Sequence, residues 1–579
     1  MENLDPVILF EFKEKYLEIK RILQHSKFDP ESEPYKSKYA AIFLLQEMRA
    51  KALNLTSNSH STNETKERLQ AIVFSSSLML ATEFIETEEP SKGEEILNFI
   101  LEETKEIYFL PSLILTVVST LNQLGLLWSQ RGDNLKSYEF LKKAESLYEE
   151  YKSKIVETPL QVNAIFDVPN EHATDENGLE NIYTLTLFYL AQVVGNLGNS
   201  IKSAVLCHKT LNRQLEYKVF DPIDWALNSA TLAQFFIEQN AFTEARHHLA
   251  AASFILDKAA SNLEPNLTEE EIEAKKEQLL HRNADVERCW AKYGIALLCC
   301  SKDRLMESED YLKPPDELLG LKFSTLDFTS YENQVTKDYI LTYVDARLLF
   351  IDVKLRLQRA SVFYSLEDHA SDYILIAQDM SQLYKSLTFF EEDEERQAKM
   401  HKRRVDLLQD VLKEVNPEIY VTLCRELWYE LGEVESEILD IKLTRIQNSA
   451  DTPNPHFLHK VNVSARRAIQ AFTLFLDSLK DRITKQFPVV FPAELEKPAL
   501  LAYFYLGRLH SKLITADQEL KIVNMKESIR CYQMVVDYCE KNPSAVENVS
   551  VELGICKEMV TLMPIKMMKL VGSLSNLTI

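Results

Sequence analysis

Apolar residues recur at intervals of three and four positions along most of the 579-residue chain. This spacing places them on one face of an α-helix, which repeats every ~3.6 residues. Alternating apolar and polar runs bounded by glycine or proline, which would predict β-strands, are hard to find. Only 12 residues are glycine, so few positions favour left-handed turns or phosphate-binding loops. The pattern predicts an all-α protein.

The predicted helices come in pairs that share one pattern of large and small residues. The first helix carries a large residue, then leucine followed by glycine or alanine, and then an aromatic residue in most pairs. The second helix carries small residues around a large one, which lets the two helices approach closely. Such pairs, typical of tetratricopeptide repeats, are predicted over Leu80–Ile100, Leu121–Ala144, Leu187–Cys207, Leu232–Ala252 and Tyr503–Val535. Successive pairs lie more than the usual ~34 residues apart, so the repeats are divergent.

The helical pattern lapses in several polar or proline-bearing stretches. One of them, residues 301–335, contains Pro314 and Pro315, which disfavour a continuous helix. We therefore expect an N-terminal helical domain over 1–310, a linker over 311–337 and a C-terminal helical domain over 338–579. The acidic stretch 263–277 is also expected to form a loop.

The charge balance limits the classes of ligand. The chain has 65 basic and 88 acidic residues, which gives a net charge of −23. Such a protein repels phosphate backbones and attracts basic surfaces, so nucleic acid is not expected as a ligand.

The distribution of cysteines and apolar stretches favours a soluble protein of the cytoplasm. The 8 cysteines show no framework spacing, as expected for reduced thiols. The first residues are acidic where a signal peptide would be basic and then apolar. The most apolar long stretch, Leu110–Trp128, is interrupted by polar residues at helical intervals, so we expect a packed helix and no membrane insertion.

Motifs of common enzymes are missing from the sequence. It contains no Walker A, GxGxxG, GxSxG, HExxH or CxxC pattern. The adjacent pair His247 and His248 points to different faces of a helix, which favours packing or exposure over a shared metal ion. We therefore expect no enzyme activity and assign no catalytic, cofactor-binding or metal-binding residue.

Several segments, in order along the chain, resemble the KIF-binding protein family of kinesin-binding tetratricopeptide proteins. They include Glu33–Tyr39, Leu124–Arg131, Asp221–Leu232, Lys399–Arg404 and Ile514–Asp517. The resemblance implies a right-handed α-solenoid of antiparallel helix pairs in two subdomains. It implies binding to the motor domains of a subset of kinesins, which blocks their attachment to microtubules. A cytoplasmic, cytoskeleton-associated protein acting in mitochondrial transport and axon outgrowth is expected on the same basis.

The resemblance also points to polar residues of the central repeats as the motor-binding surface. First helices line the concave face of a tetratricopeptide array, where a helical ligand can lie. The expected partner-binding residues are Tyr189, Gln192, Gln214, Thr231, Gln234 and Asn122. An acidic concave face could engage the motor surface that otherwise meets tubulin. The alternative for Tyr189 and Thr231 is simple packing between helices.

Other binding roles remain open at this level. A co-chaperone would need a basic clamp for acidic peptide ends, but Phe188, Gln192 and Asn196 occupy the corresponding positions. A general cytoplasmic scaffold has no such requirement, because a solenoid offers two faces. The chain lacks a long heptad repeat, which argues against a coiled-coil dimer, so a monomer is the expected state.

Overall fold

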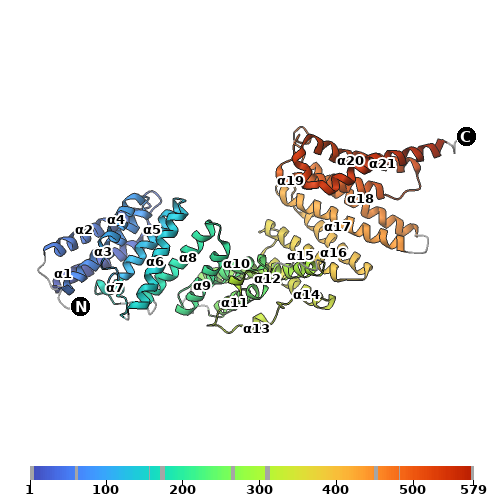
Figure 1. Ribbon diagram of the computed structural model, residues 1–579. Helices are drawn as coiled ribbons and strands as arrows, with labels where there is room; N and C mark the ends of the chain where they lie inside the picture. The colour runs from blue at the N-terminus through green and yellow to red at the C-terminus, as the bar shows by residue number, and fades with distance from the viewer. Residues whose placement is uncertain are drawn as a thin grey trace. The chain divides into compact units, whose positions relative to one another are not determined.

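The computed structural model describes residues 5–58, 63–155, 157–169, 177–262, 268–306, 313–448, 454–481 and 483–575. Throughout these ranges the chain forms α-helices joined by turns, loops and short 3-10 segments, and no β-strand occurs in them (Figure 1). The prediction of an all-α fold is confirmed.

The helices form two compact units, and the chain passes between them more than once. Unit 1 comprises residues 1–265 and 312–333, and unit 2 comprises residues 266–311 and 334–579. The helices of unit 1 are α1 (Pro6–His25), α2 (Lys36–Asn58), α3 (Asn63–Glu86), α4 (Pro90–Glu103), α5 (Ile114–Gln130), α6 (Asn134–Lys154), α7 (Val162–Ile165), α8 (Gly178–Asn196), α9 (Ser200–Tyr217), α10 (Pro222–Glu238), α11 (Phe242–Ser261) and α13 (Thr329–Glu332). The helices of unit 2 are α12 (Glu269–Met306), α14 (Tyr343–Phe363), α15 (Ala370–Phe390), α16 (Glu394–Glu414), α17 (Val421–Asn448), α18 (Pro455–Asp477), α19 (Ala493–Lys512), α20 (Gln518–Lys541) and α21 (Ser550–Ser575).

The division into units differs from the predicted domains of 1–310 and 338–579 with a linker over 311–337. Most of that segment packs on unit 1, where Leu318, Phe323 and Phe328 are buried. Helix α12 begins inside the expected loop 263–277 and packs against α14 and α15 of unit 2. Its three acidic residues at 269–271 lie in the first helical turn, where the helix dipole stabilises negative charge. Pro314 and Pro315 do lie outside the helices, but the apolar residues decide which unit a segment joins.

All five predicted helix pairs are present, as α3–α4, α5–α6, α8–α9, α10–α11 and α19–α20. Their small residues allow the close approach that the pattern predicts. A Cβ atom on Gly125 of α5 would lie 2.5 Å from the Leu141 side chain of α6, and one on Gly507 of α19 would lie 2.8 Å from Tyr532 of α20.

A serine on the second helix fixes three of these pairs by the same hydrogen bond. The hydroxyls of Ser137, Ser203 and Ser528 donate to the carbonyl oxygens of Gly125, Ala191 and Gly507 at 2.6, 2.7 and 2.6 Å. The carbonyl in each case belongs to the glycine or alanine that follows the leucine of the first helix. The residues that define the repeat thus supply both the space and a polar link between its helices.

The four pairs of unit 1 share one three-residue turn. Its middle residue has a left-handed φ, with values of 63°, 81°, 86° and 58° at Glu88, Gly132, Gly198 and Asn240. In each turn the following N–H donates back to a carbonyl five residues earlier, as Asp133 does to Trp128 at 3.0 Å. This hydrogen bond closes the end of the first helix, and glycine adopts the left-handed conformation without a Cβ penalty.

Two helices bear on the question of membrane insertion. The apolar stretch Leu110–Trp128 forms much of α5, whose residues are mostly buried in unit 1, as predicted. Within the described ranges, only Glu64–Glu86 of α3 is long and apolar enough to cross a membrane, and 67% of its most apolar window is buried inside the protein.

Candidate partner-binding groove

Unit 1 carries a groove of about 350 Å³ between helices α8, α9 and α10. The groove is lined by Phe188, Ala191, Gln192, Gly195, Ser200, Ser203, Ala204, Cys207, Thr210, Leu211, Gln214, Asn228, Thr231, Leu232 and Phe235. Its four residues from α8 occupy positions i, i+3, i+4 and i+7, so they share one face of that helix. Apolar members such as Leu211 and Leu232 are buried, whereas Gln192, Asn228 and Thr231 are exposed. The groove therefore combines an apolar interior with uncharged polar groups that can reach a ligand.

Three of the six predicted partner-binding residues meet in this groove. Gln192 comes from α8, Gln214 from α9 and Thr231 from α10, so three helices contribute one predicted side chain each. Their amide and hydroxyl groups can donate and accept hydrogen bonds without bringing a charge. This arrangement suits a ligand that presents apolar side chains beside polar, neutral groups.

The other three predicted residues lie outside the lining. Tyr189 is half-buried against the core between α5, α6 and α8, and burial raises the pKa of its hydroxyl. Asn122 is buried, and it links α5 to α8 by donating to the Ile182 carbonyl at 3.2 Å and accepting from Thr186 at 2.9 Å. Gln234 is half-buried on α10. Tyr189 therefore packs between helices, which was the alternative considered from the sequence, whereas the packing role of Asn122 was not expected.

The groove carries no formal charge, which differs from the acidic face that we expected. None of its lining residues is Asp, Glu, Lys, Arg or His. The thiol of Cys207 stays neutral because burial raises its pKa. The net charge of −23 is therefore spread over other surfaces, where it can guide a basic partner but cannot pair with it inside the groove.

Comparison with known proteins decides the family. A family model described as KIF-1 binding protein C terminal matches residues 223–570. KIF-binding proteins of Drosophila melanogaster and Gallus gallus are 35% and 36% identical to the chain, over 96% and 94% of both sequences. The chain belongs to the KIF-binding protein family.

Similarity to other family members extends to the fold. The human KIF-binding protein is 33% identical over 95% of this chain and 96% of its own length. A solved structure of a kinesin binding protein matches with a TM-score of 0.67 and 30% identity, covering 97% of this chain and all of the other. The resemblance seen in the sequence is thus confirmed, and the family fold extends over both units.

The groove of this KIF-binding protein family member also includes residues that sequence reasoning did not select. Phe188 and Phe235 contribute exposed or half-exposed rings, and Asn228 contributes an exposed amide. Phe188 could have been found from its position one helical turn before Gln192. Asn228 and Phe235 have the same relation to Thr231, at three positions before it and four after it.

A cluster of buried histidines lies next to the groove residues of α9. The ring of His208 packs on Phe323 of the returning segment and approaches His248 at 3.0 Å between Nδ1 and Nε2. His248 Nδ1 lies 2.7 Å from the Glu244 carbonyl, which can only accept, so this nitrogen carries a proton. His247 Nε2 accepts from the Phe323 N–H at 2.8 Å, and its Nδ1 therefore donates to Glu332 at 2.8 Å. All three rings fit this network as neutral tautomers. Of the two roles expected for His247 and His248, packing or exposure, the structure shows packing.

Acid is expected to destabilise unit 1 through these histidines. Burial lowers the pKa of His208 to about 4, and burial also lowers the pKa values of His247 and His248. These pKa values lie below the ordinary histidine value of ~6.5. The neutral histidines therefore make their full contribution to the free energy of unfolding above pH ~6.5, and this contribution is lost as the pH falls toward ~4. His208 alone is expected to cost about 3 kcal/mol at the end of that range. Urea unfolding at several pH values measures the loss.

His208→Gln is the matched variant for this pH dependence, because glutamine keeps a donor for His248 but does not titrate. The variant should unfold with a shallower dependence on pH between ~4 and ~6.5 than the original protein. An unchanged slope would exclude His208 as a contributor.

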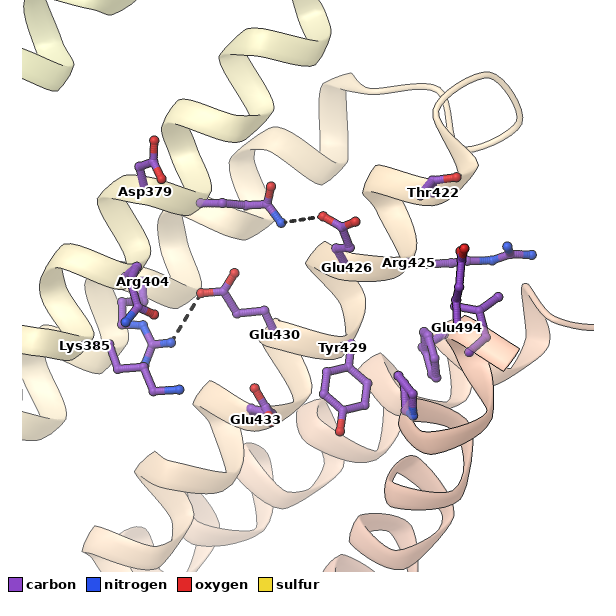
Figure 2. Close-up of a pocket in the computed structure, with 15 residues that line it drawn as sticks. Asp379, Lys385, Arg404, Thr422, Arg425, Glu426, Tyr429, Glu430, Glu433 and Glu494 are labelled. Atoms are coloured by element: carbon purple, nitrogen blue, oxygen red, sulfur yellow. Dashed lines mark hydrogen bonds and ion pairs between the residues drawn. The ribbon is translucent and has the colours of Figure 1, made fainter. Parts of the chain in front are cut away.

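Unit 2 contains a larger, charged cleft of about 610 Å³ between α15, α16, α17, α18 and α19 (Figure 2). Its buried cation is already paired, since Arg404 donates to Glu437 at 2.7 Å, to Glu430 at 3.3 Å and to Ser381 at 3.0 Å. Arg425 turns away from Glu430 and donates to the Ser478 carbonyl at 2.7 Å. Burial raises the pKa values of two further acids of this cleft, Asp379 and Glu433.

Arg404 ends the basic run Lys399–Arg404, for which the sequence favours a helix face that is either solvated or paired within the chain. The structure shows pairing within the chain for Arg404, whose side chain is 1% exposed. The neighbouring Arg403 is exposed to solvent. Burial therefore separates two adjacent arginines that look equivalent in the sequence.

Proposed function

We propose that this chain binds the motor domains of a subset of kinesins through the groove of unit 1 and blocks their attachment to microtubules. The observation that carries the proposal is the meeting of Gln192, Gln214 and Thr231 in one accessible groove. Family membership supports it, since the relatives are named for binding KIF proteins. Binding without catalysis fits a groove that has no acid or base in its lining.

The geometry favours a helix of the motor as the bound element. Apolar side chains on one face of such a helix can enter between Phe188 and Leu211, while its polar positions bond Gln192 and Thr231. The negative net charge increases the rate of encounter with a basic motor surface. Occupation of that surface excludes the microtubule, which needs the same face of the motor. Through this inhibition the protein would regulate mitochondrial and axonal transport in the cytoplasm, in association with the cytoskeleton.

Microtubule co-sedimentation of several purified kinesin motor domains, with increasing amounts of the full chain, tests the inhibition. A direct binding assay without microtubules runs beside it. The proposal expects that some motors bind the chain and leave the microtubule pellet. Motors that bind but stay on microtubules would instead indicate a general scaffold or adaptor. Absence of binding by every motor would contradict the proposal.

Gln192→Ala combined with Thr231→Ala is expected to weaken motor binding by about tenfold or more, because two hydrogen-bonding groups of the groove are lost together. Isothermal titration with a motor that binds the original chain measures the effect. Tyr189→Ala with Gln192→Ala should also weaken binding, but Tyr189 packs on the core, so stability must be measured with it.

Asn196→Ala is the matched control for the groove variants. Asn196 is exposed on the same helix as Gln192 but does not line the groove. Its replacement should leave motor binding unchanged. Equal affinities of the control and the groove variant would remove this groove from the binding surface.

A further inference from the structure

Helix α14 of unit 2 exposes an apolar stripe along much of its length. Its members lie at alternating intervals of three and four residues, which is the spacing of a helix that packs along another helix. On the helix they are Val344, Leu348, Ile351, Leu355 and Val362, with exposed fractions from 45% to 73%. Leu341, which lies two residues before the helix start, is 65% exposed as well. The one missing position of the series is Gln358, which is also exposed. A stripe of this length exceeds the single exposed apolar residues that are normal on protein surfaces.

The opposite face of α14 already supplies the contacts that hold the helix in unit 2. Leu349, Val353 and Leu357 are buried, and α14 packs against α12 and α15. The approach to α12 is close, since a Cβ on Gly294 would lie 2.2 Å from Val353. The exposed stripe is therefore not needed for the core. A helix that is apolar on two faces normally buries both of them.

Charges of opposite sign border the stripe. By helical geometry, Arg347 and Lys354 lie along one edge, and Asp345 and Asp352 lie along the other. Arg359 lies farther along that second edge and is paired with Glu287 at 3.2 Å. The acidic edge opens into a groove of about 440 Å³ that is also lined by Asp338 and Leu348, and no lysine or arginine is among its lining residues.

The acids of this groove are only partly neutralised. Asp352 accepts from Arg356 at 2.7 Å, and Asp338 pairs with Lys337 at 3.2 Å. Asp345 forms no ion pair with any residue of the described ranges. Its carboxylate accepts from the Thr342 hydroxyl at 2.7 Å, and its N–H donates to the same hydroxyl oxygen at 3.3 Å. The groove can therefore still receive a cation.

We propose that the exposed face of α14 is the docking surface for an amphipathic helix of a partner protein. The partner helix carries apolar residues at the same three-and-four spacing. Lysine or arginine lines its edge toward Asp345, and acidic residues line its edge toward Arg347. The apolar stripe supplies affinity, and the two charged edges fix the direction of the bound helix.

A second copy of this chain fits the surface less well. Two antiparallel α14 helices would place their Arg347 and Lys354 edges against each other. Two parallel helices would bring Arg347 opposite Asp352, but they would also bring Lys354 opposite Arg359. The antiparallel arrangement brings like charges together along the basic edge, and the parallel arrangement does so at Lys354 and Arg359. A partner helix whose charges complement both edges of α14 has no such contact.

A labelled synthetic peptide of about 21 residues, the length of α14, tests the proposal with the full chain. The peptide is helical, with leucine at each stripe position, lysine along one edge and glutamate along the other. We expect saturable binding in fluorescence anisotropy, and a loss of about tenfold or more when Leu348→Glu and Ile351→Glu are combined. The matched control is Ile419→Glu with Val489→Glu, two residues of unit 2 that are 71% and 93% exposed outside the stripe. This control should bind like the original chain, and equal weakening by both variants would overturn the proposal.

Charge reversal tests the acidic edge. Asp345→Lys should weaken binding of the peptide, and a second peptide with glutamate in place of its lysines should recover the affinity. Failure of that recovery would overturn the proposed edge pairing. Analytical sedimentation of the chain alone tests whether a second copy of the chain occupies this face instead. A dimer that becomes monomeric when Leu348→Glu and Ile351→Glu are combined would show that it does, and would overturn the proposal. These outcomes do not depend on motor binding, which is assigned to unit 1.

Discussion

Replacing Arg404 with methionine is expected to lower the free energy of unfolding of unit 2 by about 3–5 kcal/mol, because a buried charge network loses its central cation. Arg404 is 1% exposed and bonds Glu437, Glu430 and Ser381. Burial opposes ionisation of Glu437, yet its pKa is held down to about 2 by the hydrogen bond from His401 and by the charge of Arg404. Methionine fills a similar volume but leaves the two glutamates without this partner. Urea denaturation followed by circular dichroism measures the change.

Arg403→Met is the control for this experiment, since it removes the adjacent but exposed arginine. Its expected effect is within about 0.5 kcal/mol. Adding Glu430→Gln and Glu437→Gln to Arg404→Met should recover much of the loss, because no unpaired charge then remains. Similar destabilisation by the two arginine replacements would contradict a role for the buried network.

Gly432→Val on α17 is expected to destabilise unit 2 by about 3 kcal/mol, since the site has no room for a side chain. A Cβ at this position would lie 2.7 Å from the ring of Phe472 on α18. That ring cannot move aside easily, because it is fully buried and stacks on Tyr505 with 5.1 Å between ring centres. Tyr429 packs against it from another side at 5.5 Å. Thermal and urea unfolding measure the loss.

Gly554→Val on α21 separates crowding from the general effect of replacing glycine in a helix. No atom lies within 4 Å of a Cβ built on Gly554, so valine there is expected to be neutral or slightly stabilising. In the Gly432→Val background, Phe472→Leu should cost less than it does alone, because it makes space for the valine. Strictly additive effects of these two changes would argue against a steric clash.

The helix pairs could be predicted from the sequence because their contacts are local and periodic. Gly125, Leu141 and Ser137 belong to helices that follow each other directly, so their spacing already encodes the contact. The same regularity places Gln192 and Thr231 on helices α8 and α10 and brings them to one groove. Where residues occupy regular positions of the repeat, sequence reasoning therefore predicts which of them lie in the same groove.

The sequence was less informative where a contact joins distant or irregular segments. Asn122 looks like a surface amide, yet it bonds Ile182 and Thr186 on a helix that follows about sixty positions later. Phe323 lies in a proline-bearing stretch without periodicity, and its partners His208 and His247 come from two earlier helices. The uncharged groove was also unexpected, because net charge describes the whole surface and not the few residues that line one site.

The return of residues 312–333 to unit 1 has a consequence for synthesis on the ribosome. Unit 1 lacks Phe323 and Glu332 until the chain has been translated beyond them. Until then His208, Trp225 and His247 lack these packing and hydrogen-bonding partners. By then all of α12, which belongs to unit 2, has already emerged. The two units therefore mature in an overlapping order. A fragment cut after residue 265 would expose these rings, and only a peptide that supplies residues 312–333 would complete it.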